Sequence, residues 1–134
     1  MNHLFAYGTL MCGDIMAEVS GSLPASLPGV LHGYRRQCLR GEHYPALVAH
    51  PRANVNGVLY LDVPAAAWAR LDRFEGDMYS RQQVQVVLSD NVTATAMTYV
   101  LENKFLDCVE GEEWDFETFS RKWKDPFRRA YTGA

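Results

Sequence analysis

Six runs of residues in this chain have the pattern of β-strands, and helical patterns interrupt them irregularly. The predicted strands are residues 3–7, 29–39, 44–49, 58–63, 83–88 and 92–100. The predicted helices are residues 15–19, 64–75 and 114–123. A regular alternation of strands with helices would indicate a doubly wound parallel sheet. The irregular order instead predicts an α+β fold, a small, mostly antiparallel β-barrel or curled sheet with flanking helices.

Turn signals set the expected ends of several of these elements. Pro64 fits the first turn of the second helix, and Gly76 is the expected terminator of that helix. Residues 90–91 are Asp-Asn and predict a hairpin between the last two strands. The segment 51–56 contains proline and asparagine and predicts a turn. Gly33 interrupts a strand pattern, which indicates a bulge or a close approach of another backbone.

The composition is that of one globular domain. The 134 residues are 48% hydrophobic and 22% charged, which is typical of folded chains and not of disordered ones. No linker or internal repeat divides the chain, so we expect a single domain over residues 1–134. The chain begins with no basic, apolar leader and has no run long enough to cross a bilayer. We therefore expect a cytoplasmic protein that does not contact membrane.

Charge and cysteine content narrow the classes of partner and cofactor. The formal net charge of -3 argues against wholesale attraction to nucleic acid. The late basic cluster is either the solvated face of an amphipathic helix or a phosphate- or RNA-binding patch. Its members are Arg121, Lys122, Lys124, Arg128 and Arg129. With three cysteines and no CxxC or HxxxH pair, we expect no disulfide framework and no bound metal.

The first candidate site is the turn after the N-terminal strand, Tyr7-Gly8-Thr9-Leu10. A chain that turns sharply after a buried strand points successive N–H groups the same way and can hold an anion or a polarised carbonyl oxygen. Gly8 lacks a Cβ and lets a ligand approach the backbone. The alternative is a turn with no further task. Cys12 lies close by, and it is either a nucleophile or an ordinary small thiol.

The second candidate is Glu75, at the end of the predicted 64–75 helix. Phe74 and Tyr79 give it apolar neighbours, which would raise the pKa of its carboxyl group. Arg73 and Arg81 are also close in sequence and would lower that pKa instead. A single carboxylate cannot support a two-carboxylate glycosidase mechanism. It can move one proton from an attacking group to a leaving group.

These two stretches together resemble the γ-glutamylcyclotransferase-like superfamily. The resemblance rests on Phe5-Ala6-Tyr7-Gly8-Thr9-Leu10 and on Leu71-Asp72-Arg73-Phe74-Glu75-Gly76 with Tyr79 and Arg81. The segments Tyr44-Pro45-Ala46-Leu47 and Asn56-Gly57-Val58-Leu59-Tyr60 follow the same order of elements, so the likeness covers roughly residues 3–101. The loop has Gly-Thr where the glutathione- and amino-acid-directed branches have Gly-Ser-Asn. It is closer to the branch that acts on γ-glutamylamines.

The resemblance implies a small β-barrel with a cavity at one end and a reaction without metal or cofactor. In that reaction the α-amino nitrogen of a small γ-glutamyl substrate attacks the γ-carbonyl carbon and releases 5-oxoproline and an amine. Carried over by position, Glu75 is the catalytic acid and base. Tyr7, Gly8, Thr9 and Leu10 form the substrate loop, and Tyr79 is a further substrate-binding residue. The tail after Asp107 lies outside these motifs and is expected to close or narrow the cavity.

A second hypothesis is a non-catalytic protein on the same fold that binds a small molecule or a partner. The two hypotheses differ in the surroundings expected for Glu75. In the enzyme it points into a cavity beside the Tyr7-to-Leu10 amides, whereas in the binding protein it is solvated and paired with Arg73 or Arg81. Nothing in the sequence fixes the oligomeric state.

Overall fold

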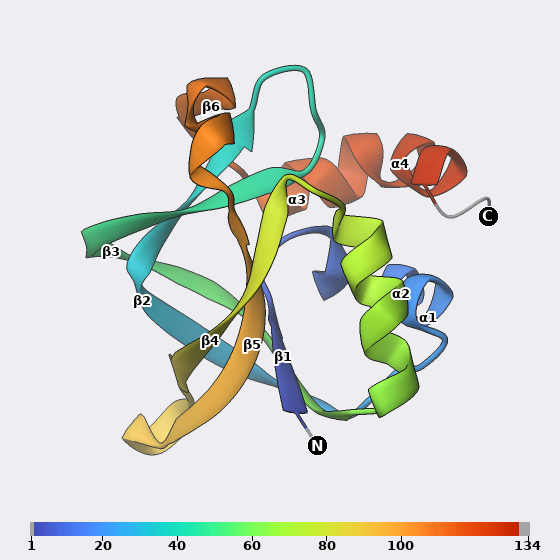
Figure 1. Cartoon of the computed structure of the whole chain (residues 1–134), viewed down its shortest axis with the longest axis vertical. Coiled ribbons are helices and arrows are strands. Elements are labelled where there is room, and N and C mark those ends of the chain that lie inside the picture. The colour runs from blue at the N-terminus through green and yellow to red at the C-terminus, as the bar shows by residue number, and fades with distance from the viewer. Residues whose placement is uncertain (1, 132–134) are drawn as a thin grey trace.

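The computed structural model describes residues 2–131, in which five strands close into a barrel and a sixth adds to its outside (Figure 1). The barrel order is β3-β1-β5-β4-β2, and β2 pairs back onto β3 to close it. The β1–β5 pair is parallel and the other pairs are antiparallel. The strands are β1 (Asn2–Ala6), β2 (Ser26–Leu39), β3 (Pro45–Val63), β4 (Tyr79–Val87), β5 (Thr93–Leu101) and β6 (Val109–Glu113). The predicted α+β barrel, mostly antiparallel with flanking helices, is confirmed.

The turn predicted at residues 51–56 is wrong, because β3 runs through this segment without a break. Asn54 lies opposite His32 and Asn56 opposite Val30 on β2. The pairing is nevertheless irregular here, because Tyr34 lies opposite Ala49 and His32 opposite Asn54, so residues 50–53 of β3 face Gly33 alone, whose φ is 88°. Glycine adopts this left-handed conformation at little cost, which confirms the expected bulge. Pairing with β2 therefore overrides the local turn preference at residues 54–56, and the β2–β3 bulge takes up residues 50–53.

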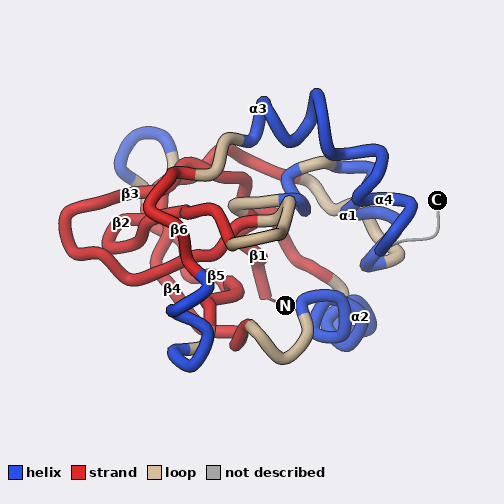
Figure 2. The backbone as a smooth tube through the Cα atoms, turned by 90° about the horizontal axis from the view of Figure 1, so that it is seen from above, coloured by secondary structure: helices blue, strands red, loops and turns tan. Residues whose placement is uncertain are grey.

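Three helices pack together on one side of the barrel: α1 (Gly13–Ser20), α2 (Ala65–Glu75) and α4 (Lys124–Tyr131). Figures 1 and 2 both show this grouping, with the C-terminal end of the described chain beside α4. Helix α2 begins one residue later than predicted, because Pro64 is its N-cap, and Gly76 caps its C-terminal end as expected. Before α4 come α3 (Phe116–Thr118) and a π-helical turn (Phe119–Trp123). The helix predicted at residues 114–123 thus begins at Phe116, two residues later than expected, and the helical segment continues to Tyr131.

Strand β1 separates two hydrophobic clusters because its side chains alternate between its faces. Phe5 and Tyr7 join a cluster fed by all five barrel strands, which fills the barrel. Leu4 and Ala6 face the other way, into a cluster shared with the helices. Burying each large apolar side chain contributes roughly 1.5–3 kcal/mol. The end of β1 is therefore held firmly on both sides at the point where Tyr7 leads into the next loop.

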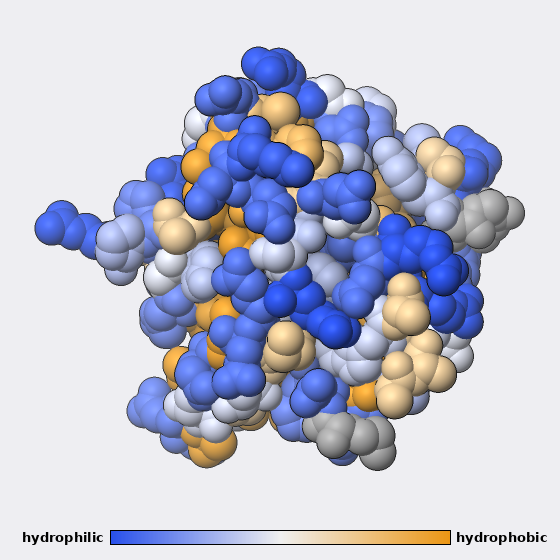
Figure 3. All heavy atoms as spheres, viewed as in Figure 1, coloured by the Kyte–Doolittle hydropathy of each residue, from blue (hydrophilic) through white to orange (hydrophobic). Residues whose placement is uncertain are grey.

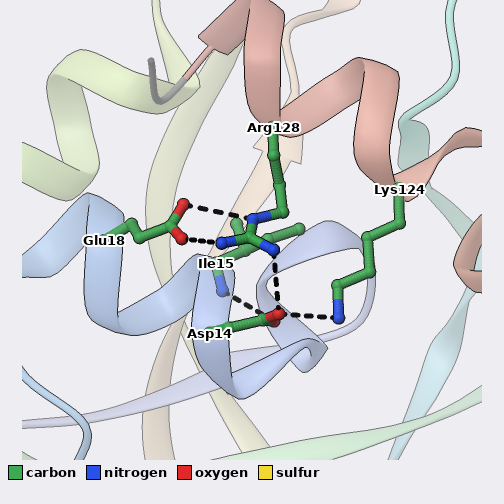
Figure 4. Close-up of polar contacts among 5 residues, drawn as sticks. All are labelled: Asp14, Ile15, Glu18, Lys124 and Arg128. Carbon is green, nitrogen blue, oxygen red and sulfur yellow. Dashed lines mark hydrogen bonds and ion pairs between the residues drawn. The ribbon is translucent and has the colours of Figure 1, made fainter. Parts of the chain in front are cut away.

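Helix α4 is joined to α1 by ion pairs, which Figure 4 shows in close-up. Lys124 Nζ lies 2.8 Å from the carboxylate of Asp14, and Arg128 Nη1 lies 3.4 Å from the same carboxylate. Arg128 also contacts the carboxylate of Glu18. Two members of the basic cluster therefore bind acidic partners within the fold, while Arg121, Lys122 and Arg129 are exposed.

The face drawn in Figure 3 is mainly hydrophilic, and hydrophobic side chains are visible between polar ones. The large hydrophobic residues with substantial exposure come from different elements: Leu23, Leu27, Val92, Leu106, Trp123 and Tyr131. Over residues 2–131, no helix has the length and apolar character needed to cross a membrane.

Candidate active site

A cavity of about 170 Å³ lies where the end of β1, the end of α2 and the helix α4 meet. Both stretches singled out from the sequence contribute to its wall, although more than sixty residues separate them along the chain. The wall combines the β1 loop and the carboxyl group of Glu75 with side chains that are mostly phenylalanine and tyrosine. The lining residues are Leu4, Phe5, Ala6, Tyr7, Gly8, Thr9, Leu10, Tyr44, Pro45, Phe74, Glu75, Tyr79, Tyr99, Phe127 and Tyr131.

Glu75 is the last residue of α2, and its carboxyl group lines this cavity. The residue retains some exposure to the cavity, but protein atoms crowd the carboxyl group. This burial, with a smaller contribution from the negative charge of Asp72, raises the pKa of Glu75 to about 8. Among the described residues, neither Arg73 nor Arg81 forms an ion pair with it. Arg81 lies instead 3.5 Å from the Asp72 carboxylate and over the ring of Trp68.

The loop after β1 forms a short 3₁₀ helix (Thr9–Met11) against the same cavity. The carbonyl groups of Gly8 and Thr9 accept hydrogen bonds from Met11 and Cys12. In the part of the chain that the structure describes, the N–H groups of Thr9 and Leu10 have no acceptor. The first turn of a helix leaves such donors open. A buried wall thus carries backbone donors that a ligand oxygen can satisfy.

Side chains from distant strands fix the position of this loop. The Tyr7 hydroxyl donates to the Tyr99 carbonyl at 2.7 Å, and Arg36 donates to the Tyr7 carbonyl at 2.9 Å. The Tyr60 hydroxyl donates to the Leu10 carbonyl at 2.6 Å. Sequence reasoning missed Arg36 and Tyr60 as supports of the loop. Their spacing from it, 29 and 50 residues, carries no local signal of contact.

Tyr79 lies in the cavity wall, where the sequence motif suggested, but its hydroxyl is already engaged. It donates to the Pro45 carbonyl at 2.7 Å. Burial, and then the nearby charge of Glu75, raise the pKa of Tyr79 well above its ordinary value. The ring of Pro45 in turn packs on Gly8, where an added Cβ would lie 2.8 Å from Pro45 Cγ. The Tyr79 hydroxyl therefore fixes the position of Pro45, whose ring packs against Gly8.

The structure gives Cys12 no place in the cavity wall. Its side chain is buried, and that burial is the main cause of a raised pKa for the thiol. A thiol that resists ionisation and does not line the cavity is a poor nucleophile. Among the described residues, no cluster of three or more His, Cys, Asp or Glu side chains is arranged to hold a metal ion.

The C-terminal tail contributes to the cavity, as the sequence led us to expect. Phe127 and Tyr131 of α4 form part of the wall. The ring of Trp123 stacks on His43, with ring centroids 4.2 Å apart. The sequence could suggest that the tail narrows the cavity, but it could not identify which of its aromatic residues do so.

Comparison with known proteins agrees with this architecture. The family model described as "Gamma-glutamyl cyclotransferase, AIG2-like" matches residues 4–116. The chain belongs to this γ-glutamyl cyclotransferase, AIG2-like family. Protein AIG2 C of Arabidopsis thaliana is 34% identical over 133 residues, which cover 96% of this chain and 80% of that protein. This γ-glutamyl cyclotransferase, AIG2-like chain is thus similar to that relative over nearly its whole length.

Solved structures show the same fold for this member of the γ-glutamyl cyclotransferase, AIG2-like family. The solution structure of an Arabidopsis thaliana protein has a TM-score of 0.74 at 33% identity, over 96% of this chain and 81% of that chain. A structure titled "Gamma-glutamyl cyclotransferase" has a TM-score of 0.69 over 81% of this chain and 68% of that one. Its identity is 17%, so it supports the fold alone.

Proposed function

We propose that this protein is a cyclotransferase that cleaves a small γ-glutamyl amide or γ-glutamylamine into 5-oxoproline and a free amine. The observation that carries the proposal is one cavity that contains both a carboxyl group with a pKa of about 8 and open backbone donors. The surroundings of Glu75 favour the enzyme over the non-catalytic binding protein, because the carboxylate is not paired with Arg73 or Arg81 in residues 2–131.

In the proposed reaction, the α-amino nitrogen of the substrate attacks its own γ-carbonyl carbon. The new C–N bond closes a five-membered ring, and the carbonyl oxygen becomes an oxyanion. The N–H groups of Thr9 and Leu10 stabilise that negative charge. The nucleophile belongs to the substrate, so the enclosed cavity acts chiefly by holding the substrate in a folded, near-attack shape.

Glu75 carries the proton between the two nitrogens. Its carboxylate takes a proton from the attacking nitrogen, and the resulting carboxylic acid gives a proton to the departing nitrogen as the original amide bond breaks. The net result is 5-oxoproline, a free amine and a regenerated carboxylate. A pKa of about 8 suits both steps, because an acid–base group works best near the operating pH.

The test is release of 5-oxoproline from a panel of γ-glutamyl dipeptides and γ-glutamylamines. We expect Glu75→Gln to lower turnover by about 10²- to 10⁴-fold, the usual contribution of an acid–base group. Asp77→Asn is the matched control, because Asp77 is exposed and lies just beyond Gly76. Unchanged turnover in folded Glu75→Gln would refute the assigned chemistry. Silence of the folded native chain on every substrate would favour the non-catalytic alternative.

A further inference from the structure

Part of the cavity wall lies outside the segment that the family model matches. The family model ends at residue 116, whereas Phe127 and Tyr131 of α4 both line the cavity. The β1 loop and Glu75, which surround the reacting atoms in the proposed reaction, lie inside the matched segment. The addition made by α4 is therefore suited to contact a different part of the substrate.

Helix α4 packs an aromatic surface against Phe74, the residue that precedes Glu75 in the sequence. Phe127 is 3% exposed, and its ring centroid lies 6.0 Å from that of Phe74, the neighbour of Glu75. Phe127 also meets Tyr44 edge-on at 6.3 Å. Tyr131 stacks on Phe127 at 4.7 Å and meets Tyr44 at 6.1 Å. In the proposed reaction Glu75 gives a proton to the departing nitrogen, so the leaving amine would lie beside this surface.

The aromatic surface is held in place by contacts outside the cavity. Lys124 and Arg128 bind the acidic side chains of α1, as Figure 4 shows. Trp123 stacks on His43, just before the strand that begins at Pro45. These contacts tie α4 to α1 and to the segment before β3, so the aromatic surface is largely in position before a ligand binds.

The charges of the cavity narrow what this surface can bind. Among the described residues, the lining includes no lysine, arginine or histidine. A leaving group with a carboxylate, such as an amino acid, would add a second carboxylate to that of the γ-glutamyl part, and it would lose water there without gaining a cation. A cationic leaving group would lose water among aromatic side chains, and the acidic side chain of the lining, Glu75, is already used in the proposed reaction. An uncharged, apolar group meets neither cost.

We propose that α4 selects γ-glutamyl substrates whose leaving amine is aromatic or bulky and apolar and carries no carboxylate. This inference rests on the proposed function, which it makes more specific. Phe127 and Tyr131 contact the leaving amine, and Glu75 with the β1 loop acts on the γ-glutamyl part that all such substrates share.

The first experiment compares four substrates that differ only in the leaving amine: γ-glutamyl-benzylamide, γ-glutamyl-methylamide, γ-glutamyl-phenylalanine and γ-glutamyl-cadaverine. We expect kcat/KM for the benzylamide to exceed each of the others by at least about tenfold, the scale on which an apolar pocket discriminates. γ-Glutamyl-phenylalanine has a ring and a carboxylate, and γ-glutamyl-cadaverine has an alkyl chain and a cation, so the two substrates introduce opposite charges in the leaving amine.

The second experiment tests the assignment to α4. Tyr131 is 54% exposed, so Tyr131→Ala leaves the core intact, and we expect the benzylamide-to-methylamide ratio of kcat/KM to fall several-fold. Phe127→Leu is a second variant that keeps an apolar side chain in the core. Arg129→Ala, on the exposed face of the same helix, is the matched control and should leave the ratio unchanged.

The outcomes separate this inference from the function on which it rests. Release of 5-oxoproline from all four substrates at similar rates would overturn the selectivity while leaving the cyclotransferase intact, as would a preference for γ-glutamyl-phenylalanine or γ-glutamyl-cadaverine. An aromatic preference that survives both Tyr131→Ala and Phe127→Leu would overturn the assignment to α4. Failure to release 5-oxoproline from any substrate would overturn both proposals.

Discussion

The hydroxyl of Tyr99 on β5 donates a 2.6 Å hydrogen bond to the carboxylate of Asp72, three residues before Glu75 on α2. Arg81 lies 3.5 Å from the other oxygen of that carboxylate. These contacts fix a negative charge close to Glu75. That charge is the second cause, after burial, of the raised pKa of Glu75.

Asp72→Asn should therefore make Glu75 easier to ionise. The amide keeps an oxygen for the Tyr99 hydroxyl but removes the charge, so the pKa of Glu75 falls. Because the carboxylate is the proton acceptor in the proposed reaction, the rising limb of the pH profile of kcat/KM should move to lower pH by a fraction of a unit. The partial exposure of Asp72 keeps the shift small.

The measurement is 5-oxoproline release between pH 5 and 10. Asp77→Asn removes the same charge at an exposed position beyond Gly76 and should leave the limb in place. A limb that stays fixed in Asp72→Asn, or moves to higher pH, would contradict the electrostatic link.

Glu75 should also weaken the fold at high pH. Its pKa is about 8 in the folded protein, against an ordinary value of 4.5. Between these values the folded state holds a proton that the unfolded state has released, so stability falls as pH rises from about 4.5 to 8. Below pH 4.5 the group is protonated in both states and contributes no pH dependence.

Glu75→Gln removes this penalty. The variant should match the native protein near pH 4 and become the more stable of the two as pH rises. The gain should be at most about 1.4 kcal/mol per pH unit, reaching a few kcal/mol by pH 9. Urea unfolding at pH 4.5, 7 and 9 measures the difference in unfolding free energy between the two proteins. A difference that does not change with pH would show that burial does not raise the pKa of Glu75.

The parts of the fold that could be predicted are those set by local chemistry. Pro64 and Gly76 mark the ends of α2, and Asp90 with Asn91 forms the turn between β4 and β5. Segment 51–56 could not be predicted in this way. Its proline and asparagine favour a turn locally, but residues 54–56 pair with residues 30–32 of β2, and this strand partner lies more than twenty residues earlier in the chain.

In the candidate site, too, local sequence motifs could be predicted and contacts between distant residues could not. The β1 loop and Glu75 carry recognisable motifs, and the structure brings both to one cavity. The contacts that shape the cavity have no such signal. Arg36 reaches the Tyr7 carbonyl, and Phe127 reaches Tyr44, only because barrel closure and helix packing bring distant residues together. Their roles follow from tertiary structure and not from spacing.

Gly8 should not tolerate even the smallest side chain. A Cβ at this position would lie 2.8 Å and 2.9 Å from two ring carbons of Pro45, which is too close for carbon atoms. The Tyr79 hydroxyl holds the Pro45 carbonyl, so the loop must move and not the wall. In Gly8→Ala we expect kcat/KM to fall by roughly 10²-fold, because a displacement of about 1 Å misaligns the reacting atoms.

The control is Gly111→Ala, because nothing lies within 4 Å of the Cβ position at Gly111. Circular dichroism and urea unfolding would separate misalignment from unfolding, since overpacking costs typically about 1–3 kcal/mol. Native-like kcat/KM in Gly8→Ala would mean that the position of this loop does not matter for turnover.

The pair formed by Asp14 and Lys124 should couple α1 to α4 in a way that salt and acid both weaken. Lys124 lowers the pKa of Asp14, so the stabilisation is present above the ordinary pKa of an aspartate and is lost as pH falls below it. Both side chains are partly exposed, which limits the coupling to about 1 kcal/mol or less. A double-mutant cycle with Asp14→Asn and Lys124→Met measures it by urea unfolding. The coupling should shrink in 1 M salt, where screening is strong, and at pH 3.

The control is Lys122→Met, which removes an exposed charge from the same cluster and should show no coupling to Asp14→Asn. A coupling energy between Asp14 and Lys124 that changes with neither salt nor acid would rule out an electrostatic origin.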